Sequence, residues 1–307
     1  MEQKKKVILL AGPTASGKSK LAIKLAQHFG GEIINADSMQ VYKEISILTS
    51  KPNIQDIKII RHHLYGFKSV KQKFSTGHWL KMVVKKIEKL WKNGRTPIVV
   101  GGTGLYFKAL TDGLVKIPDI SNKMRTEIRK LHKKIGQRKF FIKLIKLDPL
   151  SKRFVSPSDT QRSMRAYEVK KFTDKSMFEF TKETKSNFNN STFKKLFINI
   201  PRGLLHKKIE KRVEKMFNDG AIEEAKKFYT MKVNKELSAS KIIGIKEIRD
   251  YLQDKITLIE TKELITQKTR QYAKRQFTWA RGHMKSWEMI YSPNINDLFK
   301  KAINKIS

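Results

Sequence analysis

Eight residues near the start of the chain have the types and spacing of a phosphate-binding loop. Gly12-Pro13-Thr14-Ala15-Ser16-Gly17-Lys18-Ser19 fits the pattern G-x-x-x-x-G-K-[ST]. The glycines let the backbone turn tightly enough to direct several N–H groups at one anion, and Lys18 adds a full positive charge. The hydroxyl of Ser19 is a suitable ligand for Mg²⁺ that bridges phosphates. The pattern predicts that this loop binds a diphosphate or polyphosphate, including a nucleotide such as ATP, with Mg²⁺ as cofactor.

The flanking residues supply the elements that such a loop requires. The hydrophobic run 7–11 predicts a buried strand before the loop. Leu21, Ala22, Leu25 and Ala26 recur at helical spacing after it. The loop is therefore expected between the end of a strand and the start of a helix, although a glycine turn that binds nothing is the alternative.

Two further strands are expected to end beside this loop. Residues 32–38 form a second short strand that ends at Asp37, and residues 96–104 form a third strand that runs into a glycine turn at Thr103. Ligands of open α/β sheets bind beyond the carboxyl ends of the strands, so both side chains should face the phosphate site. For Asp37, a plain turn or helix-cap role is an equally open alternative.

The order of these elements predicts an α/β fold, a parallel sheet flanked by helices like that of P-loop NTPases. Residues 1–120 and 191–307 are expected to form the catalytic core, with a returning strand at 193–201 and helices over 205–282. The amphipathic stretch 77–93 predicts a helix that carries Trp79 and Trp91 into the core. The basic segment 121–190 lacks long apolar strands and predicts a helical insertion domain.

The charge of the chain points to a polyanionic partner. There are 66 Lys and Arg residues against 28 Asp and Glu, a formal net charge of +38, although a general bias toward lysine is the alternative reading. Basic and aromatic residues interleave near the C-terminus, a pattern that fits nucleic-acid binding and a solvated helix face equally well. They are Arg270, Tyr272, Lys274, Arg275, Phe277, Trp279 and Arg281.

Composition also excludes several classes of protein. The absence of cysteine excludes disulfides and thiolate metal sites and fits a cytoplasmic protein. A mean hydropathy of −0.51, with no apolar run near the ~20 residues of a membrane span, predicts no membrane insertion. The N-terminal MEQKKK does not open a secretory signal. His62 and His63 lack metal-ligand spacing, and the lack of an apolar heptad repeat suggests a monomer.

Six stretches spread nearly from end to end give the chain a family resemblance. They are GPTASGKS (12–19), INADSMQVYK (34–43), VVGGTGLYFKAL (99–110), QRSMRAYEV (161–169), GIKE (244–247) and KRQFTWAR (274–281). With them the chain resembles the tRNA dimethylallyltransferases, also called tRNA isopentenyltransferases. It departs from the family pattern at Leu48, where glycine is usual, and at Thr160, where proline is frequent.

The resemblance implies transfer of a dimethylallyl group from dimethylallyl diphosphate to N6 of the adenine immediately 3′ of the anticodon, in tRNAs that read codons beginning with U. It implies that Asp37 is the general base and that Thr103 faces it across a channel. It further implies that Lys18 and Arg212 stabilise the departing diphosphate.

The resemblance also implies a set of contacts with the tRNA anticodon stem-loop. They are Asp37, Ser38, Met39, Gln40, Thr103, Arg125, Gln161, Arg162, Ser163, Met164, Arg165, Lys241, Gly244, Lys246, Lys274, Arg275, Gln276, Trp279 and Arg281. Three alternatives stay open beside this function. They are an adenylate isopentenyltransferase, a P-loop nucleotide kinase, and a non-catalytic RNA-binding protein that uses its loop as a nucleotide switch.

Overall fold

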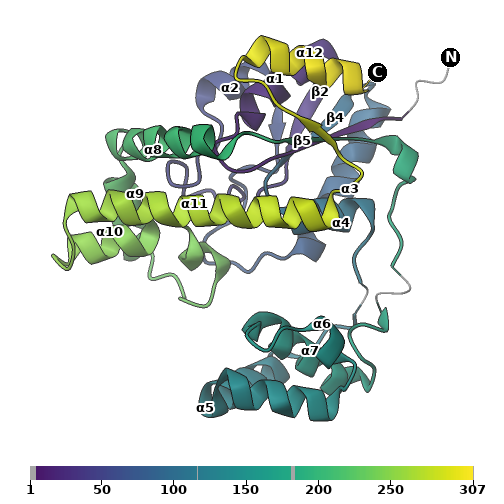
Figure 1. The fold of residues 1–307 in the computed structure, drawn as a ribbon, viewed down its shortest axis with the longest axis vertical. Helices are drawn as coiled ribbons and strands as arrows, with labels where there is room; N and C mark the ends of the chain where they lie inside the picture. Colours follow the sequence, from purple (N-terminus) through teal and green to yellow (C-terminus); the bar gives the residue numbers. More distant parts are fainter. Residues whose placement is uncertain (1–4, 116, 181–183, 307) are drawn as a thin grey trace. The chain divides into compact units, whose positions relative to one another are not determined.

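The computed structural model describes residues 5–115, 117–180 and 184–306. The chain divides into two compact units (Figure 1). One unit combines Met1–Thr111 with Asn187–Ser307, and the other is Asp112–Ser186. The sequence pattern alone predicts this insertion over 121–190. None of the helices in the described ranges combines the length and hydropathy that a membrane span requires.

A six-stranded sheet forms the centre of the first unit. Its strand order is β3-β2-β4-β1-β5-β6, and every neighbouring pair is parallel. The strands are β1 (Val7–Ala11), β2 (Gly31–Asn35), β3 (His62–His63), β4 (Thr96–Gly101), β5 (Phe193–Ile198) and β6 (Glu288–Ile290). The parallel α/β sheet is therefore confirmed. Because β1 lies between β4 and β5, the residues that follow it emerge in the middle of the carboxyl edge.

Helices cover both faces of this sheet (Figure 1). One face packs against α1 (Lys18–His28) and α12 (Ile295–Ile306), and the other against α3 (Thr76–Lys92), α4 (Gly104–Thr111) and the end of α11 (Leu258–His283). Alternate residues of β1 serve the two faces, as the pleat of a strand requires: Ile8 and Leu10 point one way, Val7 and Leu9 the other.

The predicted helical positions after the loop are confirmed, since the buried residues of α1 are Leu21, Ala22, Leu25 and Ala26. The predicted helix over 77–93 is confirmed as α3. Trp79 is fully buried and stacks on Tyr106 with ring centroids 4.3 Å apart. Trp91 is partly buried at the edge of the same core. Strand β6 and helix α12 were not predicted from the sequence.

Four helices extend the first unit beyond the sheet. They are α8 (Arg202–Asn218), α9 (Ala221–Thr230), α10 (Ile245–Leu252) and most of α11, and they share a core with residues near Tyr42 and Ile45. Three short elements complete this unit: α2 (Ile54–Ile59) between β2 and β3, a 3₁₀ turn at Asn190–Thr192 before β5, and a 3₁₀ turn at Ser238–Lys241 between α9 and α10. A capping box between Thr257 and Glu260 starts α11 by satisfying its first backbone N–H groups.

The second unit is helical and has its own core. It contains α5 (Asn122–Leu147), α6 (Ser151–Phe154) and α7 (Thr160–Thr173). Gly136 interrupts α5 with a φ of 75°. A cluster of buried apolar residues in this unit consists of Ile128, Phe140, Phe141, Leu144, Val155, Ala166 and Tyr167. All of them come from residues 112–186, so this cluster is internal to the unit.

Candidate active site

The phosphate loop, residues 12–19, joins β1 to α1 as the pattern predicted. Ala15 and Gly17 have positive φ angles of 62° and 92°. Residues of alternating handedness direct successive N–H groups into one concavity, which is the geometry of an anion nest. The Ser16 N–H donates to Pro13 O at 3.2 Å, and Lys18 Nζ donates to the same oxygen at 3.1 Å. Lys18 therefore folds back over the loop.

Asp37 lies in a tight turn just beyond β2. The fully buried Asn35 fixes this turn, because its Oδ1 accepts from Asp37 N at 2.8 Å and its Nδ2 donates to Asp37 O at 2.9 Å. The Asp37 carboxylate in turn accepts from Met39 N at 2.9 Å through Oδ1. Asp37 is thus a turn residue, which was one of the two alternatives left open by the sequence.

The charge of Asp37 also acts on the cations of the phosphate site. Burial lowers the pKa of Lys18 to about 8; the Asp37 carboxylate opposes this shift and Arg212 adds to it. Burial lowers the pKa of Arg212 as well, and Asp37 again opposes the shift. Asp37, Lys18 and Arg212 are therefore within electrostatic reach of one another.

Arg212 reaches the phosphate loop from α8. Its Nη1 donates to Thr14 Oγ1 at 2.7 Å and its Nε donates to Ser50 Oγ at 2.8 Å. These two hydrogen bonds fix the plane of the guanidinium. A surface arginine on a solvated helix face, the default for such a residue, would not have partners 198 and 162 residues away in the chain.

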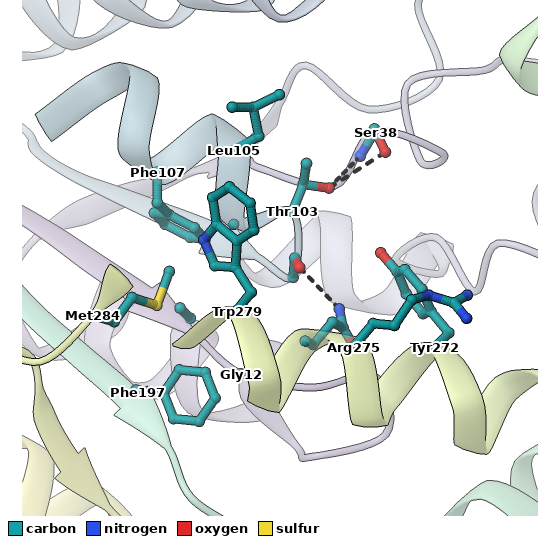
Figure 2. Close-up of a pocket in the computed structure, with 14 residues that line it drawn as sticks. Gly12, Ser38, Thr103, Leu105, Phe107, Phe197, Tyr272, Arg275, Trp279 and Met284 are labelled. Carbon is teal, nitrogen blue, oxygen red and sulfur yellow. Dashed lines mark hydrogen bonds between the residues drawn. The ribbon is translucent and has the colours of Figure 1, made fainter. Parts of the chain in front are cut away.

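Thr103 joins the end of β4 to the Asp37 turn. Its N–H donates to Ala36 O at 3.2 Å, and its Oγ1 accepts from Ser38 N at 3.0 Å. Figure 2 shows these side chains facing the same space. The strand ends that carry Asp37 and Thr103 are therefore neighbours, as the sheet topology predicted.

Helix α11 closes the site from the other side. Gln276 Oε1 accepts from Thr14 N at 2.9 Å, and its Nε2 donates to Gly102 O at 2.9 Å. One turn further along α11, the indole of Trp279 lies against Gly104, where an added Cβ would come within 2.1 Å of the ring. Trp279 also stacks on His283, with ring centroids 4.1 Å apart.

A cavity of about 250 Å³ lies between the phosphate loop and α11. Its larger apolar lining residues are Leu105, Phe107, Phe197, Trp279 and Met284 (Figure 2). The other lining residues are Ala11, Gly12, Ser38, Gly102, Thr103, Gly104, Tyr272, Arg275 and Gln276. The lining thus combines the first glycine of the phosphate loop with a group of apolar side chains.

Three buried or partly buried tyrosines lie within electrostatic reach of the Asp37 carboxylate. Burial, reinforced by this negative charge, raises the pKa of Tyr65, Tyr106 and Tyr272. Their hydroxyls therefore stay protonated throughout the neutral range. Tyr272 also carries Arg275 over its ring, with the guanidinium carbon 5.7 Å from the centroid. The sequence pattern placed Tyr272 only among the interleaved basic and aromatic residues and did not indicate its proximity to Asp37.

The other residues expected to contact RNA in the first unit differ in accessibility. Lys241, Lys246, Lys274, Arg275 and Arg281 are exposed. Gln40 instead turns inward, and its Nε2 donates to the carbonyls of Thr49 and Ser50 at 2.9 Å each. Met39 packs against the C-terminal helical core.

The family departure at Leu48 is accommodated by Gly244. This glycine has a φ of 103°, and a Cβ there would come within 2.6 Å of the Leu48 side chain. Leu48 therefore fills the space above Gly244. The Gly244 N–H donates to Glu247 Oε2 at 2.8 Å, so this turn is anchored within the protein.

The remaining predicted RNA contacts lie in the helical unit. Arg125 is on α5, and Gln161, Arg162, Ser163, Met164 and Arg165 are on α7. The expectation for two of these residues is not met. Ser163 is fully buried and accepts from Gln137 Nε2 at 3.1 Å, and Met164 packs against the unit's own core.

Thr160, the second departure from the family pattern, occupies the first position of α7. Proline suits this position because the first N–H of a helix needs no partner within the helix. In this chain the side chain of the preceding Asp159 caps the helix by accepting from Arg162 N at 2.9 Å. Threonine in place of proline therefore preserves the start of α7.

The donor set of the loop fits a magnesium ion held mainly by phosphates. Ser19 presents an exposed hydroxyl on the first turn of α1, and Ser16 Oγ is a buried oxygen with no hydrogen-bond partner within the described residues. The described chain holds no cluster of three or more His, Asp or Glu side chains suited to a metal. Mg²⁺ at phosphate sites typically uses only one or two protein oxygens.

The fold and site define an α/β protein of the P-loop class whose phosphate loop opens onto an apolar cavity. A model of the IPP transferase family matches residues 40–283. The chain belongs to this family.

Its relatives and structural neighbours are consistent with that membership. The tRNA dimethylallyltransferase of Pelagibacter ubique is 54% identical over 301 residues, which cover 98% of this chain and 96% of that protein. That of Rickettsia bellii strain OSU 85-389 is 44% identical over 99% of this chain and 96% of its own length.

Two solved structures share the fold. The tRNA isopentenylpyrophosphate transferase of Bacillus halodurans matches with a TM-score of 0.70 and 30% identity, covering 99% of this chain and 97% of that one. A eukaryotic dimethylallyltransferase acting on tRNA matches with a TM-score of 0.76 and 31% identity, covering 90% and 70%.

Proposed function

We propose that this chain is a tRNA dimethylallyltransferase that transfers a dimethylallyl group from dimethylallyl diphosphate to N6 of the adenine 3′ of the anticodon, in tRNAs that read codons beginning with U. We also propose that the enzyme is cytoplasmic and acts as a monomer. The observation that carries it is the apolar cavity that begins at the phosphate loop. A diphosphate in the nest and a short isoprenoid in the cavity would use both features at once.

The reaction breaks the C1–O bond to the diphosphate and forms a bond between C1 and N6 of adenine. Negative charge grows on the leaving diphosphate as the allylic carbon becomes cationic. The N–H groups of residues 12–19, together with Lys18 and Arg212, are positioned to stabilise that charge. Tyr272 and Trp279 also line the cavity, and aromatic rings can stabilise a neighbouring carbocation.

The exocyclic amine of adenine is a weak nucleophile and must lose a proton as it attacks. We assign this proton to the carboxylate of Asp37, which its turn holds beside the loop. Thr103, tied to the same turn through Ser38, is our candidate for a hydrogen bond to the base. The adenine has to leave its stack to reach these groups.

Magnesium would be held by Ser19 and by the phosphates themselves. When bound, it would neutralise part of the charge on the leaving diphosphate. The cations of the protein would act on the remaining phosphate oxygens.

Transfer of radiolabelled dimethylallyl from its diphosphate, with tRNA, AMP and ATP offered as competing acceptors, tests this function. The expected result is label on tRNA alone, at one adenine of the anticodon loop. Label on AMP or ATP would identify an adenylate isopentenyltransferase. Phosphate transfer from ATP without prenyl transfer would identify a kinase.

A further inference from the structure

Gln276 lies on α11 among residues expected to touch RNA, yet its contacts are with the phosphate loop. Resting on the proposed function, we infer that Gln276 is a positioning residue for the diphosphate donor and does not contact the RNA. Its side chain holds the loop in the conformation that binds the anion.

The first step is that the side chain of Gln276 is buried and already hydrogen-bonded within the protein. Gln276 is only 8% exposed. Its Oε1 accepts from Thr14 N at 2.9 Å, and its Nε2 donates to Gly102 O at 2.9 Å. Both functional groups of the amide are therefore engaged inside the protein.

The second step is that the phosphate loop needs support from outside itself. Ala15 has a φ of 62°, which is unfavourable for a residue with a Cβ. Such backbone conformations persist where surrounding structure holds them. Thr14, immediately before Ala15, is held by its N–H to Gln276 and by its Oγ1 to Arg212.

The third step is that these two supports act differently. Arg212 carries a charge and faces Asp37 and Lys18, so it can also act on the diphosphate directly. Gln276 is neutral, and its amide hydrogen-bonds to the backbone of Thr14 and Gly102. We therefore expect it to act on the donor through the backbone of the loop.

The test substitutes Gln276→Met, which keeps the length of the side chain and removes both hydrogen bonds. We expect the KM for dimethylallyl diphosphate and the Kd for inorganic pyrophosphate to rise about tenfold, as the loss of one to two hydrogen bonds predicts. The KM for tRNA and the salt dependence of tRNA binding should not change. A general loss of structure would not separate the two substrates in this way.

Gln271→Met is the matched control, because Gln271 is exposed on the same helix; it should leave all four quantities unchanged. Gln276→Glu is the second variant, in case the methionine variant does not fold. Its negative charge beside the loop should weaken pyrophosphate binding and leave the KM for tRNA unaltered.

A raised KM for tRNA with normal pyrophosphate binding would overturn the inference, and so would wild-type constants in both variants. Failure of the proposed function would look different. In that case the wild-type protein itself would transfer no dimethylallyl group to tRNA, whatever the variants do to pyrophosphate binding.

Discussion

At the scale of single residues, the carboxylate of Asp37 has two tasks that a substitution can separate. It accepts from Met39 N at 2.9 Å, which shapes the turn, and its charge acts on Lys18 and Arg212. An amide at this position keeps an oxygen for the turn but removes the charge and the ability to take a proton.

We therefore expect Asp37→Asn to lower the rate of transfer by roughly 10²–10⁴, the usual contribution of a general base. Binding of pyrophosphate and tRNA should stay near that of the wild type. Single-turnover transfer and titration with pyrophosphate measure the two effects. Asp219→Asn, which changes an exposed carboxylate at the end of α8, is the control. Near-normal turnover in Asp37→Asn would remove Asp37 as the base.

The lowered pKa of Lys18 predicts a pH dependence of donor binding. With a pKa of about 8, Lys18 carries its charge below pH 8 and loses it as the pH rises above that value. A bound anion favours the charged form, so binding above pH 8 should be accompanied by proton uptake and by falling affinity. Lys18→Arg keeps its charge over this range and should lack the uptake.

Calorimetry of pyrophosphate binding at a pH of about 8.5, just above the pKa of Lys18, in buffers of different ionisation enthalpy, measures the protons taken up. Pyrophosphate's own titration is common to both proteins, so the difference between wild type and Lys18→Arg reports Lys18 alone. Equal proton counts in the two proteins would contradict the prediction.

Residue patterns could predict the loop because its chemistry is local. The strand, the glycines and Lys18 lie within one short stretch, residues 7–19, and the buried positions of α1 follow directly at helical spacing. The partners of Thr14 could not be predicted in this way, since Gln276 is 262 residues further along the chain. Asn35 was missed for a related reason, because a buried asparagine becomes recognisable only when its turn is formed.

At the scale of elements, α11 carries the largest part of the site after the loop. Its inward residues Gln276 and Trp279 dock on the turn between β4 and α4, while Arg275 and Arg281 are exposed. The alternation of basic and aromatic residues left RNA binding and a solvated helix face as equal alternatives for this helix. The structure divides it into a face that packs and a face that is free to bind.

Removing charge from the exposed face should weaken RNA binding in a salt-dependent way. In the double variant Arg275→Gln, Arg281→Gln, we expect the slope of log affinity against log salt to become shallower by about 1 for each phosphate that is no longer neutralised. Filter binding of a tRNA over a series of salt concentrations measures it. Arg202→Gln, an exposed arginine at the start of α8, should keep the wild-type slope. An unchanged slope in the double variant would contradict the assignment.

The elements that escaped prediction are short or late in the chain. β3 has two residues and β6 has three, too few for a periodic pattern to emerge. The longer elements gave clear signals, as the helix over 77–93 did. The departure at Leu48 could not be interpreted without the structure, because the glycine that accommodates it, Gly244, lies far along the sequence.

At the scale of the whole molecule, the chain contains two compact units with separate cores. The core of the helical unit is built around Phe140, which is fully buried and packs against Tyr167 with centroids 5.1 Å apart. No residue of the sheet belongs to that core. A cavity created in that core should therefore lower the stability of the helical unit and leave the sheet unchanged.

We expect Phe140→Ala to destabilise the helical unit by about 3–5 kcal/mol, the usual effect of deleting a buried aromatic ring. Hydrogen exchange measured by mass spectrometry should show faster exchange in α5 and α7 and unchanged protection in β1 and β4. Phe172→Ala is the matched control, because Phe172 is 41% exposed on α7 and its loss leaves no internal cavity. Faster exchange across the sheet would show that the two units unfold together.

The docking of α11 on two glycines has a consequence for how this sequence can vary. Gly102 has no room for a Cβ because Gln276 occupies it, and Gly104 has none because of Trp279, with 2.1 Å to the nearest atom in both cases. A side chain at either glycine therefore requires the opposing residue of α11 to move aside or to be shorter. The two pairs should vary together, so that alanine at one glycine is rescued by a shorter residue opposite it on the helix.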